Sequence, residues 1–224
     1  MTIQESADNA TDVARDVASI LLDEDAVLIN VGKPFVYASG TVSPIYCDLR
    51  LLMRSPAARR RIVDLLAERM LADTAGSTID VVAGVATAGI PWAAWVAEAM
   101  GKPMAYARDA AKGHGRGQQV EGGVTSGQSA FVVEDLTSTG GSALAAVEGL
   151  RELGARADHS ISVFTYEFAH AKEAYQAAGV QYSSLCNITT LLGIATASGK
   201  ISADDERAVR QWLESGPMTA RPGA

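Results

Sequence analysis

Two adjacent carboxylates, followed by a turn of hydroxyl groups and glycines, form the most specific chemical pattern in this chain. Glu134 and Asp135 follow the apolar run 130–133, and a helix is expected to begin at Ser142. Between them stand Leu136, Thr137, Ser138, Thr139, Gly140 and Gly141. Backbone N–H groups at a helix N-terminus bind anions, and glycine lets the backbone approach them closely. With the hydroxyl donors, this turn suits a monoester phosphate.

The two acids require a further feature in the ligand, because carboxylates repel phosphate. A ribose ring supplies one: carboxylates can accept hydrogen bonds from its vicinal hydroxyls and can stabilise a cationic C1′. An N-capped helix after an ordinary turn is the alternative, since Ser and Thr commonly cap helices. The apolar run together with Glu134 and Asp135 favours a phosphoribosyl site.

A second candidate anion-binding turn is the segment 84–91, GVATAGIP, with Thr87 and Ala88 at its centre. It follows an apolar run and opens a helix, and its small residues leave backbone N–H groups accessible to a ligand. A tight strand–helix connection has the same appearance, so this turn gains weight only from the neighbouring patterns.

Four basic or titratable residues then stand within nine positions of an otherwise acidic chain: Arg108, Lys112, His114 and Arg116. The segment is rich in glycine and lacks apolar anchors, so we expect it to be mobile when empty. Such a loop can close over a leaving pyrophosphate, and His114 can donate a proton near neutral pH. The alternative is a solvated basic loop with a surface histidine.

The composition limits the functional classes. The chain has 224 residues, 48% of them hydrophobic, with a net charge of −7. An acidic protein is a poor candidate for binding duplex nucleic acid or a membrane surface, and the basic run 59–61 is expected to be a solvated helix face. No apolar run approaches the length of a spanning helix, and the polar N-terminus does not resemble a signal peptide. Cys47 and Cys186 form no metal-binding pattern, so free thiols in a reducing cytoplasm are expected.

Hydrophobic periodicity predicts the elements that position these residues. The N-terminal part should contain a helix over 11–23, a strand over 26–31, a hairpin pairing 35–38 with 44–48, and a helix opened after Pro56. Apolar runs at 79–83, 103–108, 130–133 and 160–164 then alternate with helices at 90–100, 142–153 and 169–178, and two helices near 187–198 and 202–215 finish the chain. Alternating strands and helices predict a single α/β domain with a parallel sheet covered on both faces. Ligands bind beyond the carboxyl ends of such strands, where the three turns should meet.

Four ring-bearing residues receive no role in this chemistry. His159 and His170 are interpreted as ordinary surface residues at strand or helix edges. Trp92 and Trp95, three residues apart on a helix, are expected to pack in the core or at a subunit interface rather than to stack on a ligand.

The chain resembles the orotate phosphoribosyltransferases, particularly the form common in Gram-positive bacteria. Five segments carry the resemblance in family order over about 10–215: PF-x-x-x-SG-x-x-SPIYCD at 34–48, GVATAGIP at 84–91, Y-x-R-x-x-x-KGHG-x-G-x-x-x-EG at 106–122, VVEDLTSTGGS at 132–142 and SVFTYE at 162–167. The first and third are specific to this family. The fourth, which binds PRPP (5-phosphoribosyl 1-pyrophosphate), is shared with enzymes that use purine bases.

The resemblance implies a type I phosphoribosyltransferase core over about 55–180, with a small N-terminal hood over about 10–50 and C-terminal helices over about 185–215. PRPP would be held by the segment 134–142 and by Thr87 and Ala88. Orotate would lie near Ser138 and Tyr46. Mg²⁺ would be carried by the pyrophosphate rather than by a protein site. The residues implied in catalysis are Arg108, Lys112, His114 and Asp135, with the loop 108–117 acting across a homodimer interface.

Two departures from the family pattern concern charge. Many members have a lysine just before the Ser-Pro of the hairpin, where Val42 stands here. Many also have a lysine one or two residues after the loop arginine, where Asp109 and Ala110 stand here. The loop therefore has one cation fewer and one anion more, and we expect weaker PRPP binding or a stronger dependence on Mg²⁺.

Two other functions remain open from the sequence. The same fold could use a purine base, although the hairpin and the KGHG loop argue against it. A non-catalytic PRPP-sensing regulator of nucleic acid should carry a basic surface and lack Lys112 or His114, and neither feature is found in this sequence.

Overall fold

A central sheet of six strands organises the computed structural model, which describes residues 3–37, 40–108 and 119–215, without the side chains of residues 3–9. Its strands, in spatial order, are β10 (Gln181–Asn187), β9 (Arg156–Thr165), β8 (Ser129–Thr137), β5 (Val81–Val85), β6 (Met104–Ala107) and β7 (Val120–Glu121). All neighbours are parallel except β7, which is antiparallel to β6. The predicted α/β fold with a mostly parallel sheet is confirmed.

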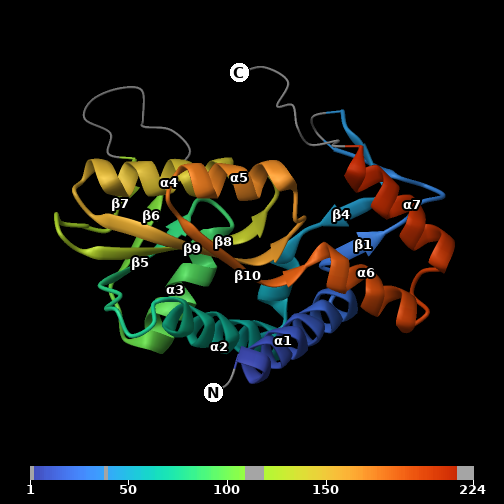
Figure 1. Cartoon of the computed structure of the whole chain (residues 1–224), viewed down its shortest axis with the longest axis horizontal. Coiled ribbons are helices and arrows are strands. Elements are labelled where there is room, and N and C mark those ends of the chain that lie inside the picture. The colour runs from blue at the N-terminus through green and yellow to red at the C-terminus, as the bar shows by residue number, and fades with distance from the viewer. Residues whose placement is uncertain (1–2, 38–39, 109–118, 216–224) are drawn as a thin grey trace.

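Helices cover both faces of this sheet, as predicted. On one face lie α4 (Gly141–Glu152) and α5 (Ala169–Ala177), and on the other α1 (Ile3–Asp23), α2 (Pro56–Asp73) and α3 (Gly89–Met100), as Figure 1 shows. A strand enclosed in this way is apolar on both sides, and every residue of β5 is buried. Side chains alternate between the faces: Val82 packs toward α1–α3, and Val81 and Ala83 pack toward α4.

The hood differs from the predicted hairpin. β2 (Phe35–Val36) pairs with β3 (Val42–Ser43), whereas β4 (Ile45–Cys47) pairs antiparallel with β1 (Val27–Ile29). Pro44 separates β3 from β4, and because it lacks an N–H it cannot continue the ladder. The predicted pairing of 35–38 with 44–48 is therefore wrong, because the second strand turns away to a partner nearer the N-terminus.

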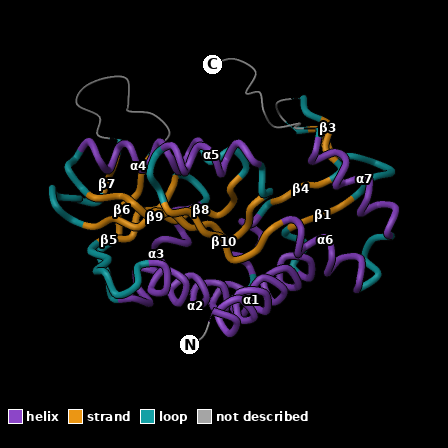
Figure 2. The backbone as a smooth tube through the Cα atoms, in the orientation of Figure 1, coloured by secondary structure: helices purple, strands orange, loops and turns teal. Residues whose placement is uncertain are grey.

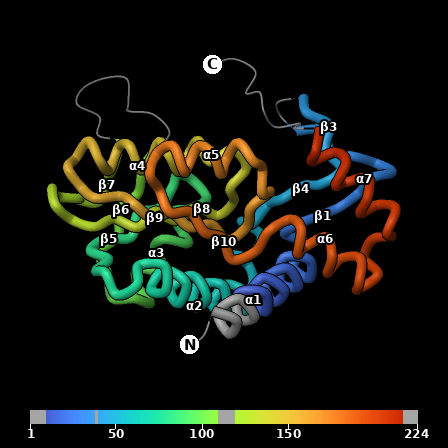
Figure 3. The backbone as a smooth tube through the Cα atoms, in the orientation of Figure 1, coloured from blue at the N-terminus to red at the C-terminus, as the bar shows by residue number. Residues whose placement is uncertain are grey.

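The C-terminal helices complete the hood. α6 (Ile188–Ala197) and α7 (Ala203–Glu214) lie beside β1 and β4 in Figure 2, although they follow these strands only much later in the chain. The colours of Figure 3 show the same return of the red C-terminal segment to the blue N-terminal one. One contact is explicit: the Trp212 indole N–H donates to the carbonyl oxygen of Val42 over 3.0 Å.

Several boundaries also differ from the sequence-based expectations. β10 was not anticipated, because most of its residues are polar and it is an edge strand with only one neighbour. The short β7 lies inside a stretch interpreted as an irregular loop. β8 and β9 are longer than their apolar runs, and β8 extends through both acids to Thr137. α1 begins at Ile3, earlier than the predicted residue 11.

The structure confirms the prediction for the two tryptophans and corrects the one for the two histidines. Trp92 is fully buried in the core, as expected, and its ring contacts Trp95 edge-on. His159 and His170 are not ordinary surface residues: both are partly buried and stack on Phe131 and Phe168 respectively, at ring-centre distances of 5.3 Å. Within the described ranges, no helix combines the length and the apolar character needed to cross a bilayer.

Candidate active site

Three predicted turns meet at the carboxyl edge of the sheet. β6, β5 and β8 are adjacent strands, with Val85 opposite Ala107 and Gly84 opposite Val133. The turn after β5 is tied directly to the end of β6, because the N–H of Ala86 donates to the carbonyl oxygen of Ala107 over 2.8 Å. The segments beginning at residues 86, 108 and 134 therefore lie side by side, although they are far apart in the sequence.

A close backbone contact joins the turn after β5 to the end of β8. A Cβ atom added at Gly89 would lie 2.7 Å from the carbonyl oxygen of Val133, so only glycine lets α3 begin this close to the strand. Thr87, just before this contact, is exposed, Ala88 is partly buried, and the peptide bond before Thr87 is cis. The structure thus places Thr87 and Ala88 beside Glu134.

The turn from β8 into α4 leaves its backbone N–H groups accessible. Gly140 is the N-cap of α4 with φ of +79°, and no side chain caps the helix. A Cβ atom at Gly140 would lie 2.8 Å from the ring of Tyr175, so the left-handed conformation and the close packing both require glycine here. Uncapped N–H groups at the positive end of a helix dipole form a binding site for an anion.

The two acids of the motif lie on opposite sides of β8. Val132 packs toward α4 and Val133 toward α3, so strand alternation directs Glu134 and Asp135 to these two sides in turn. Glu134 is buried and can accept a hydrogen bond from the Thr137 hydroxyl over 3.4 Å. Burial, and next the Glu134 carboxylate, raises the pKa of Tyr175, which places Glu134 toward α5.

Asp135, in contrast, lies toward the hood. Burial raises the pKa of the Asp135 carboxyl, while hydrogen bonds from the backbone N–H groups of Leu136 and Asp135 act in the opposite direction. The charges of Arg50 and Asp48, which follow β4, also act on it. A carboxylate that is partly desolvated between the hood and the turn before α4 can interact strongly with positive charge in a ligand.

A polar contact holds the hood against this edge of the sheet. The N–H of Tyr166 donates to the carbonyl oxygen of Thr137 over 3.1 Å, and the Tyr166 hydroxyl donates to the Cys47 sulfur over 3.1 Å. Burial raises the pKa of Cys47 to about 12, so the thiol stays protonated at neutral pH. Neither cysteine forms a disulfide, as expected. No role was predicted for Tyr166 or Cys47 individually, although both belong to segments that carried the family resemblance.

The residue expected to contact the base, Tyr46, belongs to an aromatic cluster of the hood. Its ring centre lies 5.6 Å from that of Phe35 and 6.3 Å from that of Tyr37. Tyr46 is partly buried, and Ser138, the other residue expected near the base, is also partly buried. Tyr46 is on β4 and Ser138 follows β8, so the hood contact through Cys47 brings their elements together.

The cationic segment is only partly covered by the structure. Arg108 follows β6, is partly buried, and forms an ion pair with Glu121 of β7 at 2.6 Å. Lys112 and His114 lie outside the described residues, as do Asp109 and Ala110. Among the residues that are described, no group of three His, Cys, Asp or Glu side chains could hold a metal ion.

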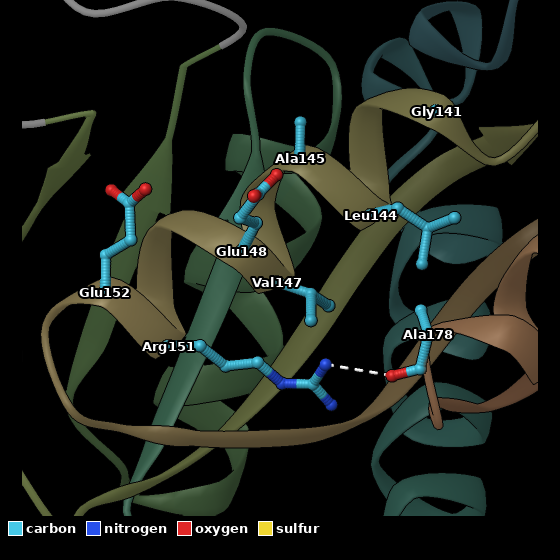
Figure 4. Close-up of a pocket in the computed structure, with 8 residues that line it drawn as sticks. All are labelled: Gly141, Leu144, Ala145, Val147, Glu148, Arg151, Glu152 and Ala178. Atoms are coloured by element: carbon cyan, nitrogen blue, oxygen red, sulfur yellow. Dashed lines mark hydrogen bonds between the residues drawn. The ribbon is translucent and has the colours of Figure 1, made fainter.

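An open hollow of about 700 Å³ lies elsewhere, on the outer surface of α4 (Figure 4). Its lining includes Glu148, Glu152 and Arg151, whose Nη1 donates to the carbonyl oxygen of Ala178 over 2.9 Å. Two carboxylates would repel a phosphate ligand, and the one guanidinium already donates a hydrogen bond to the backbone. Among the predicted site residues that the structure describes, only Gly141 borders this hollow.

Comparisons with known proteins agree with this geometry. Residues 52–180 match the family model described as phosphoribosyl transferase domain. The orotate phosphoribosyltransferase of Bacillus mycoides is 44% identical over 90% of this chain and 95% of its own length. The crystal structure of orotate phosphoribosyltransferase from Aeropyrum pernix superposes with a TM-score of 0.71 at 34% identity, covering 83% of this chain and 99% of that one. Leishmania donovani UMP synthase gives a TM-score of 0.76 at 27% identity, covering 90% of this chain and 42% of that one.

Proposed function

The chain belongs to the orotate phosphoribosyltransferase family, and we propose that it carries out the family's reaction at the carboxyl edge of the central sheet. Its activity is the transfer of the phosphoribosyl group from PRPP to orotate, giving orotidine 5′-monophosphate and pyrophosphate in pyrimidine synthesis. The observation that carries the proposed location is the uncapped N-terminus of α4 beside Asp135 and the turn at Thr87.

Each part of PRPP corresponds to one of the three turns. The 5-phosphate would accept hydrogen bonds from the N–H and hydroxyl groups of residues 137–142. The pyrophosphate would lie against Thr87 and Ala88, within reach of Arg108. The ribose would then lie between them, with its C1′ near Asp135, because Asp135 is located between the two turns on the hood side.

The reaction breaks the bond between C1′ and the pyrophosphate oxygen and forms a bond between C1′ and N1 of orotate, with the N1 proton released to solvent. Positive charge develops on the ribose, and the Asp135 carboxylate would stabilise it. Arg108, Lys112 and His114 would bind the departing pyrophosphate, with His114 donating a proton or hydrogen bond to it. Mg²⁺ bound by pyrophosphate oxygens would neutralise leaving-group charge, in keeping with its preference for substrate phosphates.

The assembly and the location of the protein are part of the same proposal. We propose a homodimer in which the loop 108–117 of one subunit completes the site of its partner, supported by the family pattern at 106–122. A cytoplasmic location is supported by the two free cysteines, since thiols persist in reducing compartments.

Incubation with PRPP, Mg²⁺ and one base at a time tests the substrate. We expect consumption of orotate and release of pyrophosphate, with no consumption of guanine or hypoxanthine. The Asp135→Asn variant is the matched control, because Asn has nearly the same size as Asp and lacks its charge; we expect it to consume orotate much more slowly. Use of a purine base instead of orotate would contradict the proposal.

A further inference from the structure

The short 3₁₀ helix η1 (Leu49–Arg54) places a well-oriented cation at the edge of the hood. Asp48 caps η1 by accepting from the N–H of Arg50 over 3.2 Å. The same carboxylate binds the guanidinium at two points, with Nε to Oδ1 at 2.6 Å and Nη2 to Oδ2 at 2.9 Å. This paired geometry fixes the orientation of the side chain. The side chain nevertheless remains 63% exposed, and its Nη1 forms no hydrogen bond within the described residues.

A contact shortly before Arg50 in the chain places it near the carboxyl ends of β8 and β9. Three residues earlier, Cys47 accepts a hydrogen bond from Tyr166, which follows β9 and is bonded to Thr137 at the end of β8. Burial raises the pKa of Asp135 and Arg50 counteracts this rise, so the two charges interact. Arg50 also interacts with Tyr46 of the aromatic cluster.

Orotate, the second substrate, needs a cation close to its binding position. Orotate carries a carboxylate on C6, the ring carbon next to the N1 atom that attacks C1′. With C1′ beside Asp135, this carboxylate must approach another carboxylate in a partly desolvated site. The repulsion between two neighbouring carboxylates in such a site strongly disfavours binding unless a cation lies close to both. Arginine suits this role because its planar donors match a carboxylate.

Arg108, the cation at the other end of this edge, is less suitable. It follows β6, two strands away from β8, and its guanidinium is paired with Glu121. Arg50 lies on the hood side together with Asp135 and the aromatic ring of Tyr46. A flat base stacked in this region would therefore have a guanidinium at its edge.

We propose that Arg50, oriented by Asp48, binds the C6 carboxylate of orotate and selects a carboxylated pyrimidine over a neutral base. This inference rests on the proposed function, because it assumes that orotate is the acceptor at this site. It assigns to a residue of the hood the recognition of the group that distinguishes orotate from uracil.

The test is a set of steady-state measurements on Arg50→Gln, with Arg54→Gln as the matched control. Arg54 is on the same 3₁₀ helix, but it donates to the carbonyl oxygen of Glu24. For Arg50→Gln we expect the KM for orotate to rise about ten- to a hundredfold, the range for losing a hydrogen bond to a charged group. The KM for PRPP should stay within about twofold, and the preference for orotate over uracil should fall by the same factor as orotate binding. Arg54→Gln should behave as wild type.

Two results would overturn the inference: an unchanged KM for orotate in Arg50→Gln, or an equal rise in the KM for PRPP, which would assign Arg50 to a phosphate. If Arg50→Gln does not fold, Arg50→Lys carries the test, because lysine keeps the charge but loses the paired geometry. A rise in the KM for orotate alone then supports the inference, and no rise overturns it. Failure of the wild-type protein to use orotate at all would instead refute the proposed function.

Discussion

At the scale of a single residue, the burial of Asp135 lowers the stability of the protein but favours its proposed role in catalysis. Its carboxylate is partly desolvated between the hood and β8, and this burial raises its pKa, so the ionised form costs the folded protein stability. The same desolvation would strengthen its proposed interaction with a cationic ribose. Active-site acids commonly show this conflict between stability and activity.

Replacing Asp135 with Asn should separate these two effects. We expect kcat to fall on the order of 100-fold, the scale for removing one electrostatic stabiliser of a transition state. The free energy of unfolding at pH 7 should increase. Below the ordinary pKa of 3.8 the carboxyl is protonated in both states and the cost disappears, so the stability difference between variant and wild type should grow as the pH rises through 3.8 and the folded pKa. Urea unfolding at several pH values measures it, and a difference independent of pH would contradict the account.

Asp109 allows a second test at the residue scale. It lies outside the described residues, and its expected role comes from the charge pattern of the loop alone. Asp109→Lys adds a cation and removes an anion, so the KM for PRPP should fall or the Mg²⁺ requirement should weaken. Titrations of PRPP at low and high Mg²⁺ measure both effects, with Ala110→Ser as a neutral control. Unchanged PRPP affinity and turnover would show that this loop does not act through its charge.

At the scale of elements, the end of β8, the glycine turn and the start of α4 form the unit that we propose binds the 5-phosphate of PRPP. The unit depends on packing from α5, because the ring of Tyr175 lies against Gly140. The sequence pattern indicated that a glycine at position 140 lets the backbone approach a ligand. The steric reason why no larger residue fits there is Tyr175, which stands 35 positions later in the chain.

Gly140→Ala should therefore be more harmful than an ordinary substitution of a left-handed glycine. The backbone strain costs about 1–2 kcal/mol, and the contact with Tyr175 adds to it by displacing the turn. We expect a loss of about 2–4 kcal/mol in the free energy of unfolding and a raised KM for PRPP. Gly179→Ala is the matched control, since Gly179 has φ of +64° but no atom near its missing Cβ. Equal losses for the two variants would exclude the packing effect.

At the scale of the whole molecule, the hood is assembled from both ends of the chain. α6 and α7 return to β1 and β4, and the Trp212–Val42 and Tyr166–Cys47 hydrogen bonds join these distant parts. The proposed base-binding side of the site is consequently built from segments that meet only when the chain is fully folded.

The proposed dimer predicts complementation between two inactive variants. In co-expressed, differently tagged Asp135→Asn and Lys112→Ala chains, a loop acting across the interface leaves one intact site in each mixed dimer. Random pairing makes half of the dimers mixed, so activity should reach about a quarter of wild type. Each variant alone should stay far below that level. No recovery in purified mixed dimers would mean that the loop serves its own subunit.

The sequence alone predicted a chemistry for the turns and determined the alternation of strands with helices. These signals are local: glycines where the backbone needs freedom, hydroxyls before a helix, and apolar runs of strand length. They were sufficient to predict the α/β class, the three turns at one edge, and the phosphate-binding residues from Glu134 to Ser142 as candidates.

Tertiary structure decided which segments pair and which side each residue occupies. β4 joins β1 rather than its neighbour in the chain, and the polar β10 is a strand because β9 offers it an unpaired edge. Glu134 and Asp135 are separated by strand alternation, and only the packed helices and hood reveal that one faces α5 and the other Arg50. Such pairings depend on the free energy of contacts between distant segments, which no local pattern in the sequence records.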